Sequence, residues 1–317
     1  MDILFIGYSS LLKKRILPVI DNLDFIDKIS IGKYTSQRWD NHWEKVVKKP
    51  ITLYDNYEDA INNSGASLAY ITTTNNSHFV NALKTLKSGM HTLIDKPSTI
   101  SLKESNELIS LAKTNNLLVS ESTIYLYHPQ LKILKEILTE NKTEAKLITA
   151  HFSFPPLGED NFRYKKQLGG GAFLDTSPYA VSIGRYFFES VPKKCYYIEN
   201  EFTDDGTEIS YSILLKYPNG KSLIGHFGFN TEYINRLNIL GKKISIDINR
   251  IFTTTENLEN KIECKVKNIE YKIKAPKANA FELYFKNIFI SLNKRDYENH
   301  YNNMYMDSFA RELIKNN

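Results

Sequence analysis

The first 121 residues alternate short apolar runs with segments of helical spacing, and this alternation limits the possible folds more than any other feature of the sequence. Strands are predicted at 3–7, 28–32, 51–54, 68–71, 91–94 and 117–120. Helices are predicted over 11–23, around 57–61, from a cap at Asn76 or Ser77 through Lys87, and over 101–113. Strands and helices that alternate at short intervals indicate a parallel, doubly wound sheet.

After residue 121 the alternation stops and long strands dominate. We predict a helix that begins at His128-Pro129, a hairpin turn at Asn219-Gly220, and helices near 278–293 and 303–315. The predicted strands are 145–153, 193–200, 207–217, 220–230, 235–239, 243–248, 260–266 and 269–273. A chain of 317 residues exceeds what one core usually supports. We therefore expect two domains, an α/β domain at 1–121 and an α+β domain with a mostly antiparallel open sheet at 122–317.

Composition excludes several classes of protein. The net charge of +5 is spread along the chain, which argues against a nucleic-acid surface. The two cysteines, Cys195 and Cys264, form no C-x-x-C pair, and the seven histidines have no ligand spacing, so we expect no metal. No apolar run approaches the roughly 20 residues of a membrane span, and the start of the chain does not resemble a secretory leader. A cytoplasmic protein is expected.

The first strand runs into a glycine turn and a helix, the arrangement that opens a dinucleotide-binding unit. The G-x-G-x-x-G pattern is incomplete, because Gly7 is followed by Ser9 and Leu12 at the other two glycine positions. Backbone N–H groups over Ser9, Ser10 and Leu11 could still bind a phosphate, and the Ser9 hydroxyl could add a donor. The side chain of Leu12 predicts a looser approach of the helix to the strand.

The second strand ends without the acidic residue that holds the ribose 2′-hydroxyl in NAD-selective Rossmann domains. Lys33 and Arg38 follow it instead, together with two hydroxyl side chains. Two cations favour a 2′-phosphate, so NADP(H) is expected in preference to NAD(H), although a solvated polar turn would have a similar composition.

Polar residues also follow the fourth and fifth strands. Thr72, Thr73, Asn75 and His78 offer hydroxyl, amide and imidazole groups for a ribose or nicotinamide, while His78 could equally cap or pack a helix. Lys96, between Asp95 and Pro97, stands at the carboxyl end of the fifth strand, where ligands of open α/β sheets bind. Lys96 is our candidate proton-handling residue.

A glycine-rich segment in the second half places further acid–base groups. Gly169 to Gly171 allow a close backbone approach, and the following helix puts Asp175 and Tyr179 four residues apart on one face. A lysine ammonium would stabilise tyrosinate, so Tyr179 could exchange a proton with a carbonyl or alcohol. Asp175 could hold a substrate hydroxyl, and the expected substrate contacts are Asp175, Tyr179, Arg163 and Tyr125.

Together these motifs resemble the glucose-fructose oxidoreductase/inositol dehydrogenase/rhizopine-catabolism (Gfo/Idh/MocA) family over nearly the whole chain. Asp95-Lys96-Pro97 is similar to its Glu-Lys-Pro motif, and the segment from Thr73 to His78 resembles its Thr-Pro-Asn-x-x-His motif with the proline replaced. The segment from Gly169 to Tyr179 matches its Gly-Gly-Gly-x-x-x-Asp-x-x-x-His/Tyr motif in the tyrosine variant.

The resemblance implies hydride transfer between a nicotinamide cofactor and a secondary alcohol or ketone of a sugar or sugar nucleotide. It implies that Tyr179 is the acid–base group, that Lys96 assists it, and that the open sheet forms a homodimer or homotetramer interface. The incomplete glycine loop leaves an alternative, which is a non-catalytic NAD(P)-binding regulator or sensor on the same fold. Tetrapyrrole reduction and redox-neutral glycoside cleavage are further reactions of such a scaffold, and the latter usually needs a metal or other acid–base groups.

Overall fold

The computed structural model describes residues 1–40 and 42–316, and its chain divides into two compact units. The first unit contains Met1–Ser122 and Phe281–Tyr305, and the second contains Thr123–Ala280 and the chain from Met306. The two units are described separately below.

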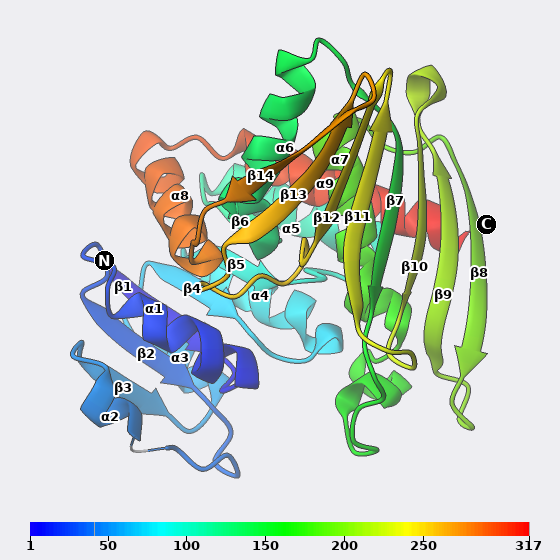
Figure 1. Ribbon diagram of the computed structural model, residues 1–317. Helices are drawn as coiled ribbons and strands as arrows, with labels where there is room; N and C mark the ends of the chain where they lie inside the picture. Colours follow the sequence, from blue (N-terminus) through cyan, green and yellow to red (C-terminus); the bar gives the residue numbers. More distant parts are fainter. Residues whose placement is uncertain (41, 317) are drawn as a thin grey trace. The chain divides into compact units, whose positions relative to one another are not determined.

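The first unit is built on a parallel six-stranded sheet with the order β3-β2-β1-β4-β5-β6 (Figure 1). Its strands are β1 (Asp2–Ile6), β2 (Lys28–Gly32), β3 (Ile51–Tyr54), β4 (Leu68–Ile71), β5 (His91–Asp95) and β6 (Val119–Ser122). Strand order reverses between β1 and β4, which is the switch point where doubly wound sheets bind ligands. This arrangement confirms the predicted fold class of the first half.

Helices connect the strands, with two differences from the prediction. The first helix begins at Ser10, contains a π-helical turn, Leu12–Ile16, and ends as α1 (Leu17–Ile20), so it ends three residues before the helix expected over 11–23. A five-residue helix, α2 (His42–Val46), had not been predicted. The other helices of the unit are α3 (Tyr57–Asn63), α4 (His78–Lys87) and α5 (Leu102–Thr114).

Two predicted helix caps had different outcomes. The Ser101 hydroxyl accepts the Glu104 N–H at 3.3 Å, so the predicted cap of α5 is present. Ser77 precedes α4, but its hydroxyl donates to Thr73 Oγ1 at 2.7 Å and makes no cap bond. The side-chain cap predicted for α4 at Asn76 or Ser77 is therefore wrong, because Ser77 holds the loop after β4 instead.

The expected second domain, 122–317, does not form one unit. Helix α8 (Ala280–Lys294) and the start of α9 (Glu298–Lys315) belong largely to the first unit. Phe285 packs against Tyr70 with ring centroids 5.9 Å apart, and the Tyr284 hydroxyl lies 2.9 Å from Ser122 Oγ. The apolar face of this segment thus completes the core around β4 and β6.

The second unit contains an eight-stranded sheet with the order β14-β13-β12-β11-β7-β10-β9-β8. All its pairings are antiparallel except that of β10 with β7, so the predicted mostly antiparallel sheet is confirmed. The Asn219-Gly220 turn joins β9 to β10 with positive φ at both residues. The strands are β7 (Ala145–Ser153), β8 (Lys194–Phe202), β9 (Glu208–Lys216), β10 (Ser222–Gly228), β11 (Ile234–Gly241), β12 (Ile244–Asn249), β13 (Asn260–Val266) and β14 (Ile269–Ala275).

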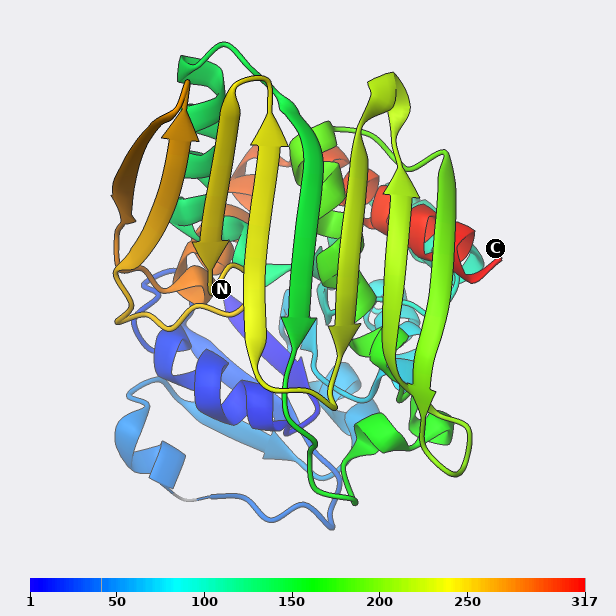
Figure 2. The same ribbon diagram turned by 45° about the vertical axis from the view of Figure 1, so that its right-hand side comes forward.

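Helices α6 (Pro129–Glu140) and α7 (Ala172–Phe188) of the second unit pack on one face of its sheet and lie behind the strands in Figure 2. Among the described residues of this unit, no helix lies on the face toward the viewer. Ile224 is exposed on β10, a strand whose alternate residues are buried, and Ile198 is exposed on the edge strand β8, most of which is exposed. The sheet therefore has an open face with apolar side chains, as expected from the alternation in β10.

Candidate functional site

The turn after β1 brings two backbones into close contact at the switch point. Gly7 has φ of +103°, and a Cβ there would lie 3.1 Å from the carbonyl group of Thr72. The Thr72 hydroxyl donates to the Gly7 carbonyl at 2.9 Å, which joins the loops after β1 and β4. A larger residue at position 7 would separate these loops, so the glycine retained from the motif is required by the backbone.

Ser9 takes part in starting the first helix. Its Oγ accepts the Leu12 N–H at 3.1 Å, and its own proton remains to be donated. Ser10 is exposed and Leu11 is half-buried beside it. Leu12 is buried at the start of the π-helical turn, where the motif would have its third glycine. The π-helical turn, which is wider than an α-helical turn, thus begins where Leu12 replaces the third glycine of the motif.

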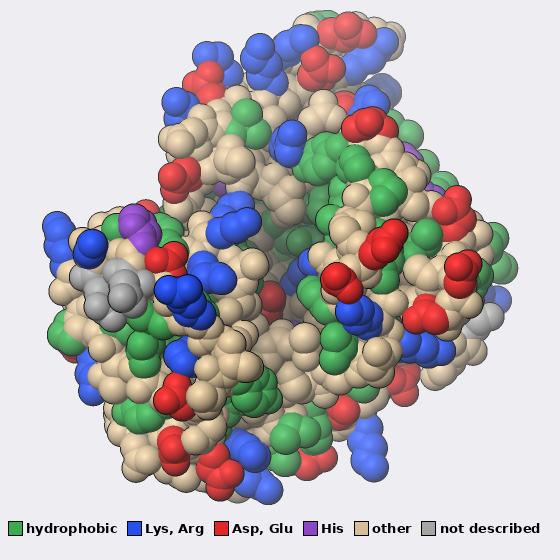
Figure 3. Space-filling view, turned by 90° about the horizontal axis from the view of Figure 1, so that it is seen from below, with side chains coloured by type: hydrophobic (Ala, Val, Ile, Leu, Met, Phe, Trp, Pro, Cys, Tyr) green, Lys and Arg blue, Asp and Glu red, His purple; other side chains and the backbone are tan. Residues whose placement is uncertain are grey.

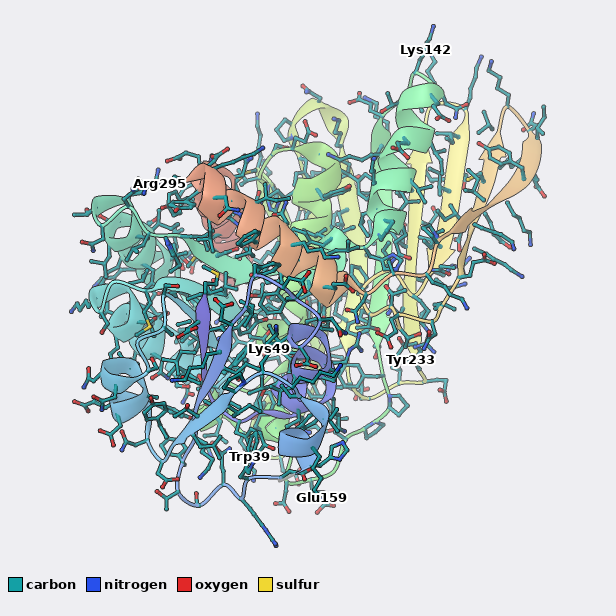
Figure 4. The ribbon with its side chains drawn as sticks, turned by 90° about the vertical axis from the view of Figure 1, so that its left-hand side faces the viewer. Trp39, Lys49, Lys142, Glu159, Tyr233 and Arg295 are labelled. Carbon is teal, nitrogen blue, oxygen red and sulfur yellow. The ribbon has the colours of Figure 1, made fainter. Side chains whose placement is uncertain are left out.

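Lys33 and Arg38, the predicted 2′-phosphate ligands, have different surroundings. The Lys33 ammonium lies 2.7 Å from Asp55 Oδ1, and its side chain is only 9% exposed. Arg38 is exposed, and no residue in the described part of the chain pairs with it. Trp39, which directly follows Arg38 and is labelled in Figure 4, packs its ring on Tyr8 with centroids 5.0 Å apart.

His78 joins the loops after β4 and β5. Its side chain is buried, with Nδ1 2.7 Å from the carbonyl oxygen of Pro97 and Nε2 3.0 Å from that of Thr73. Both contacts are to backbone, and the ring reaches the surface hardly at all. The packing alternative for His78 therefore describes the structure better than direct contact with a cofactor. Thr72 and Asn75 of the same loop are buried as well.

The turn that contains Lys96 is anchored from the neighbouring strand. The Lys96 N–H donates to Asp95 Oδ1 at 2.9 Å, and Lys96 is half-buried. Glu121, a buried carboxylate on β6, accepts both the N–H and the hydroxyl of Ser98 at 2.8 and 2.7 Å. These bonds fix the chain immediately after Pro97, so the position of Lys96 depends on a residue 25 positions later.

In the second unit, the glycine-rich segment allows the chain to fold tightly at the start of α7. A Cβ on Gly170 would lie 2.6 Å from the carbonyl oxygens of Phe162 and Arg163. Gly171 has φ of +104°, and a Cβ there would clash with the Glu208 carboxylate. That carboxylate accepts the Phe173 N–H at 3.3 Å in place of a side-chain cap, and burial raises the pKa of Glu208.

This folding brings two of the predicted site residues together. Arg163 binds Asp175 through two hydrogen bonds, Nε to Oδ2 at 2.7 Å and a terminal nitrogen to Oδ1 at 3.2 Å. The Asp175 side chain is largely buried, whereas that of Arg163 is partly exposed. Arg163 was predicted as a substrate contact and Asp175 as a catalytic residue, and the structure makes them an ion pair.

Tyr179 lies one turn after Asp175 on α7, and its ring packs among other aromatic rings. Its centroid is 4.9 Å from that of Phe152, 5.2 Å from Phe252 and 5.6 Å from Tyr125. Tyr125 was predicted as a substrate contact, but it is buried, and its hydroxyl lies 2.7 Å from Ser182 Oγ. Burial also raises the pKa of Tyr125 well above its usual range. Tyr125 therefore supports the ring of Tyr179.

Three carboxylates that support the site had not been predicted. Asp55 pairs with Lys33, Glu121 anchors the turn after β5, and Glu208 caps α7. Only Glu121 had a signal in the sequence, because it is a charged residue directly after the predicted strand 117–120.

Figure 3 shows Lys and Arg side chains interspersed with Asp and Glu on the face that it draws. Within residues 1–40 and 42–316, no three His, Cys, Asp or Glu side chains are grouped so as to hold a metal ion. None of the helices that the structure describes has both the length and the apolar character needed to cross a membrane.

Two family models match the chain. The model described as "Oxidoreductase family, NAD-binding Rossmann fold" matches residues 1–123. The model described as "GFO/IDH/MocA C-terminal domain" matches residues 134–247. The two matches fall on the two halves in which the candidate residues lie.

Two relatives and one solved structure illustrate the similarity. A dTDP-3,4-didehydro-2,6-dideoxy-alpha-D-glucose 3-reductase of Saccharopolyspora spinosa is 28% identical over 194 residues, which cover 61% of this chain and 58% of the relative. A D-xylose 1-dehydrogenase (NADP(+)) of Haloferax volcanii is 27% identical over 57% of this chain and 55% of its own. The chain thus spans little more than half of either relative. A 3-ketoreductase from Actinomadura kijaniata, solved with NADP and TDP-benzene, has the same fold, with a TM-score of 0.89 at 19% identity over 100% of this chain and 97% of its own.

Proposed function

Because this chain belongs to the Gfo/Idh/MocA family of oxidoreductases, we propose that it transfers hydride between C4 of a nicotinamide and a secondary alcohol or ketone of a sugar or nucleotide sugar. The family assignment made from the motifs is confirmed. The observation that carries the proposal is the arrangement on α7, where Tyr179 follows an ion-paired Asp175 by one turn and is held by aromatic rings.

The first unit fits a dinucleotide. Gly7 leaves room for a backbone approach that a Cβ would block, and the helix start after Ser9 offers N–H groups to a pyrophosphate. When bound, the nicotinamide supplies or accepts the hydride. We assign cofactor binding to Gly7, Ser9, Ser10, Leu11, Lys33, Arg38, Thr72, Thr73, Asn75, Asp95 and Lys96, with His78 joining their loops. Lys33 and Arg38 favour NADP(H) over NAD(H), and relatives named for NADP support this preference.

Tyr179 is the proposed acid–base residue and Lys96 its partner. The Tyr179 hydroxyl would give its proton to a carbonyl oxygen during reduction and regain it during oxidation, while the Lys96 ammonium stabilises the oxyanion. The aromatic contacts on three sides hold the ring of Tyr179 and so fix its direction. Solved structures of the Actinomadura enzyme include variants in which a tyrosine or a lysine is replaced, and these are the residue types of Tyr179 and Lys96.

Arg163 and Asp175 are proposed to bind the sugar together. Asp175 can accept a hydrogen bond from a sugar hydroxyl, and the guanidinium of Arg163 fixes the orientation of that carboxylate. The names of the relatives support a keto-sugar attached to a nucleotide as the substrate class.

Assembly and location are proposed on separate grounds. We propose a homodimer or homotetramer formed through the open face of the eight-stranded sheet, because Tyr196, Ile198 and Ile224 are exposed there. Light scattering on the purified protein tests this, and replacement of Ile224 by lysine should shift the assembly to monomers. A cytoplasmic location remains our proposal from the sequence.

The catalytic proposal is tested by oxidation of NADPH in the presence of 3-keto nucleotide sugars. Tyr179→Phe should lower kcat by about 10²–10⁴-fold and leave NADPH binding intact. Tyr305→Phe, at an exposed tyrosine on α9, is the matched control. Full turnover by Tyr179→Phe would refute the assignment. Cofactor binding without turnover of any keto sugar would favour the alternative, a non-catalytic NAD(P)-binding regulator.

A further inference from the structure

The ion pair between Lys33 and Asp55 lies at the end of the sheet that receives the adenosine part of a dinucleotide. The Lys33 N–H donates to the Tyr54 carbonyl at 2.9 Å, so β2 and β3 end side by side and both side chains leave from the carboxyl edge. The ammonium lies 2.7 Å from Asp55 Oδ1, and the Asp55 side chain is 68% exposed while that of Lys33 is 9% exposed. The lysine is thus held, and the carboxylate faces solvent.

We propose that Asp55 determines the preference of this protein between NADP(H) and NAD(H), an inference that rests on the proposed function. The acidic residue that NAD-selective Rossmann domains carry at the end of β2 is absent here. Asp55 supplies a carboxylate to the same place from the end of the next strand. No other carboxylate pairs with Lys33 among the described residues.

The charge of the pair explains how Asp55 acts. A 2′-phosphate carries close to two negative charges, and Asp55 both repels it and neutralises the cation that would bind it. A ribose 2′-hydroxyl instead donates to the carboxylate and accepts from the ammonium, so both partners of the pair are used. Asp55 therefore weakens the preference for NADP(H) that Lys33 and the exposed Arg38 create.

The chain carries its own reporter for a binding experiment. Its only two tryptophans, Trp39 and Trp43, follow β2, and Trp39 packs on Tyr8 of the glycine loop. Reduced nicotinamide cofactors absorb in the range of tryptophan emission, so quenching of this emission gives Kd for NADPH and NADH without a substrate. The variants are Asp55→Asn and Lys33→Met, and Glu58→Gln is the control that removes an exposed negative charge three residues later.

Asp55→Asn should bind NADPH about three- to tenfold more tightly than the native chain, and NADH equally or more weakly. Lys33→Met should shift the ratio of the two constants the opposite way, and Glu58→Gln should leave it unchanged. Equal changes for both cofactors, or none in folded Asp55→Asn protein, would overturn the inference while leaving the proposed function standing. A native chain that binds neither cofactor would refute the proposed function itself, so the two failures are distinguishable.

Discussion

A buried ion pair fixes α7, the helix that carries Asp175 and Tyr179, to the C-terminal part of α9. Arg185 Nε donates to Asp307 Oδ1 at 2.7 Å, and a terminal nitrogen donates to Oδ2 at 2.8 Å. The side chains are 10% and 2% exposed. Replacement of Asp307 by asparagine removes the charge with little change of volume and leaves a guanidinium in a poorly solvated place.

The geometry sets the size of the effect. Removal of one partner from a buried, two-bond ion pair costs about 3–5 kcal/mol, because the remaining charge has lost its solvent and its partner. With an unfolding entropy of about 2.1 cal/mol/K per residue, a cooperative chain of 317 residues would melt about 4–8 °C lower. Replacement of both residues, as in Arg185→Met with Asp307→Leu, removes both charges and should restore most of that loss.

Thermal unfolding followed by circular dichroism tests this comparison. The control is Glu263→Gln, which breaks an ion pair with Lys272 whose side chains are 59% and 67% exposed. Such surface pairs contribute about 0–1 kcal/mol, so its midpoint should move by less than about 2 °C. Equal shifts for Asp307→Asn and Glu263→Gln would refute the argument that burial determines the cost. A double variant less stable than Asp307→Asn would show that packing of the two side chains, and not their charge, connects the helices.

Three further predictions concern pH dependence and the supports of the site. Burial lowers the pKa of His300 from 6.5 to about 4, so the unfolded chain binds more protons between these values. Stability should fall by up to about 3 kcal/mol as the pH drops through that window, a fall that His300→Gln would lessen in acid denaturation curves. Glu121→Gln should cost about 1–3 kcal/mol in urea unfolding, since a charged acceptor of two bonds is lost, and an unchanged midpoint would contradict this role. Gly171→Ala should destabilise the protein by about 1–3 kcal/mol through its positive φ and the clash with Glu208, whereas Gly158→Ala, whose Cβ would meet open space, should be nearly neutral in the same assay.

The strands were the most predictable part of the fold. The predictions for β2, β3, β4, β7 and β13 agree with the structure residue for residue. Each is a run of apolar or alternating residues bounded by polar or turn residues, so local sequence determines both ends. The predicted strand 117–120 starts two residues before β6, Val119–Ser122. The strand begins later because the Leu117 N–H still bonds to the Ala112 carbonyl of the preceding helix.

Helix assignment to the two units could not be read from the sequence. An apolar face shows that a helix packs against something, but it does not name the partner. Phe281–Tyr305 follows the last strand of the second sheet and returns to the first, where Phe289 stacks on Phe25 with centroids 4.2 Å apart. The π-helical turn that begins at Leu12 could not be predicted either, because its apolar residues have ordinary α-helical spacing.

For the candidate site, the sequence identifies residues through motifs, whereas the structure identifies what holds them. Lys33, Lys96 and the start of α7 were all predicted from motifs, and each is supported by a carboxylate far away in the sequence. In the first unit, these long separations in sequence follow from the fold, because neighbouring strands of a parallel sheet are joined by long crossovers. Asp55 and Glu121 come from the strand adjacent to the one whose loop they support.

The supporting carboxylates also differ in a way that bears on function. Glu121 is buried, Glu208 is half-buried, and both bind backbone N–H groups, so a change in either acts on the shape of a loop or helix. Asp55 is exposed and binds a side-chain cation, so a change there acts on charge with little effect on shape. On the inference that Asp55 determines cofactor preference, a substitution at position 55 would change that preference without loss of the fold. A substitution at position 121 or 208 would instead disturb the turn that contains Lys96 or the start of α7, and would lower stability. We therefore expect a switch between NAD and NADP to occur at Asp55 while Glu121 and Glu208 stay unchanged.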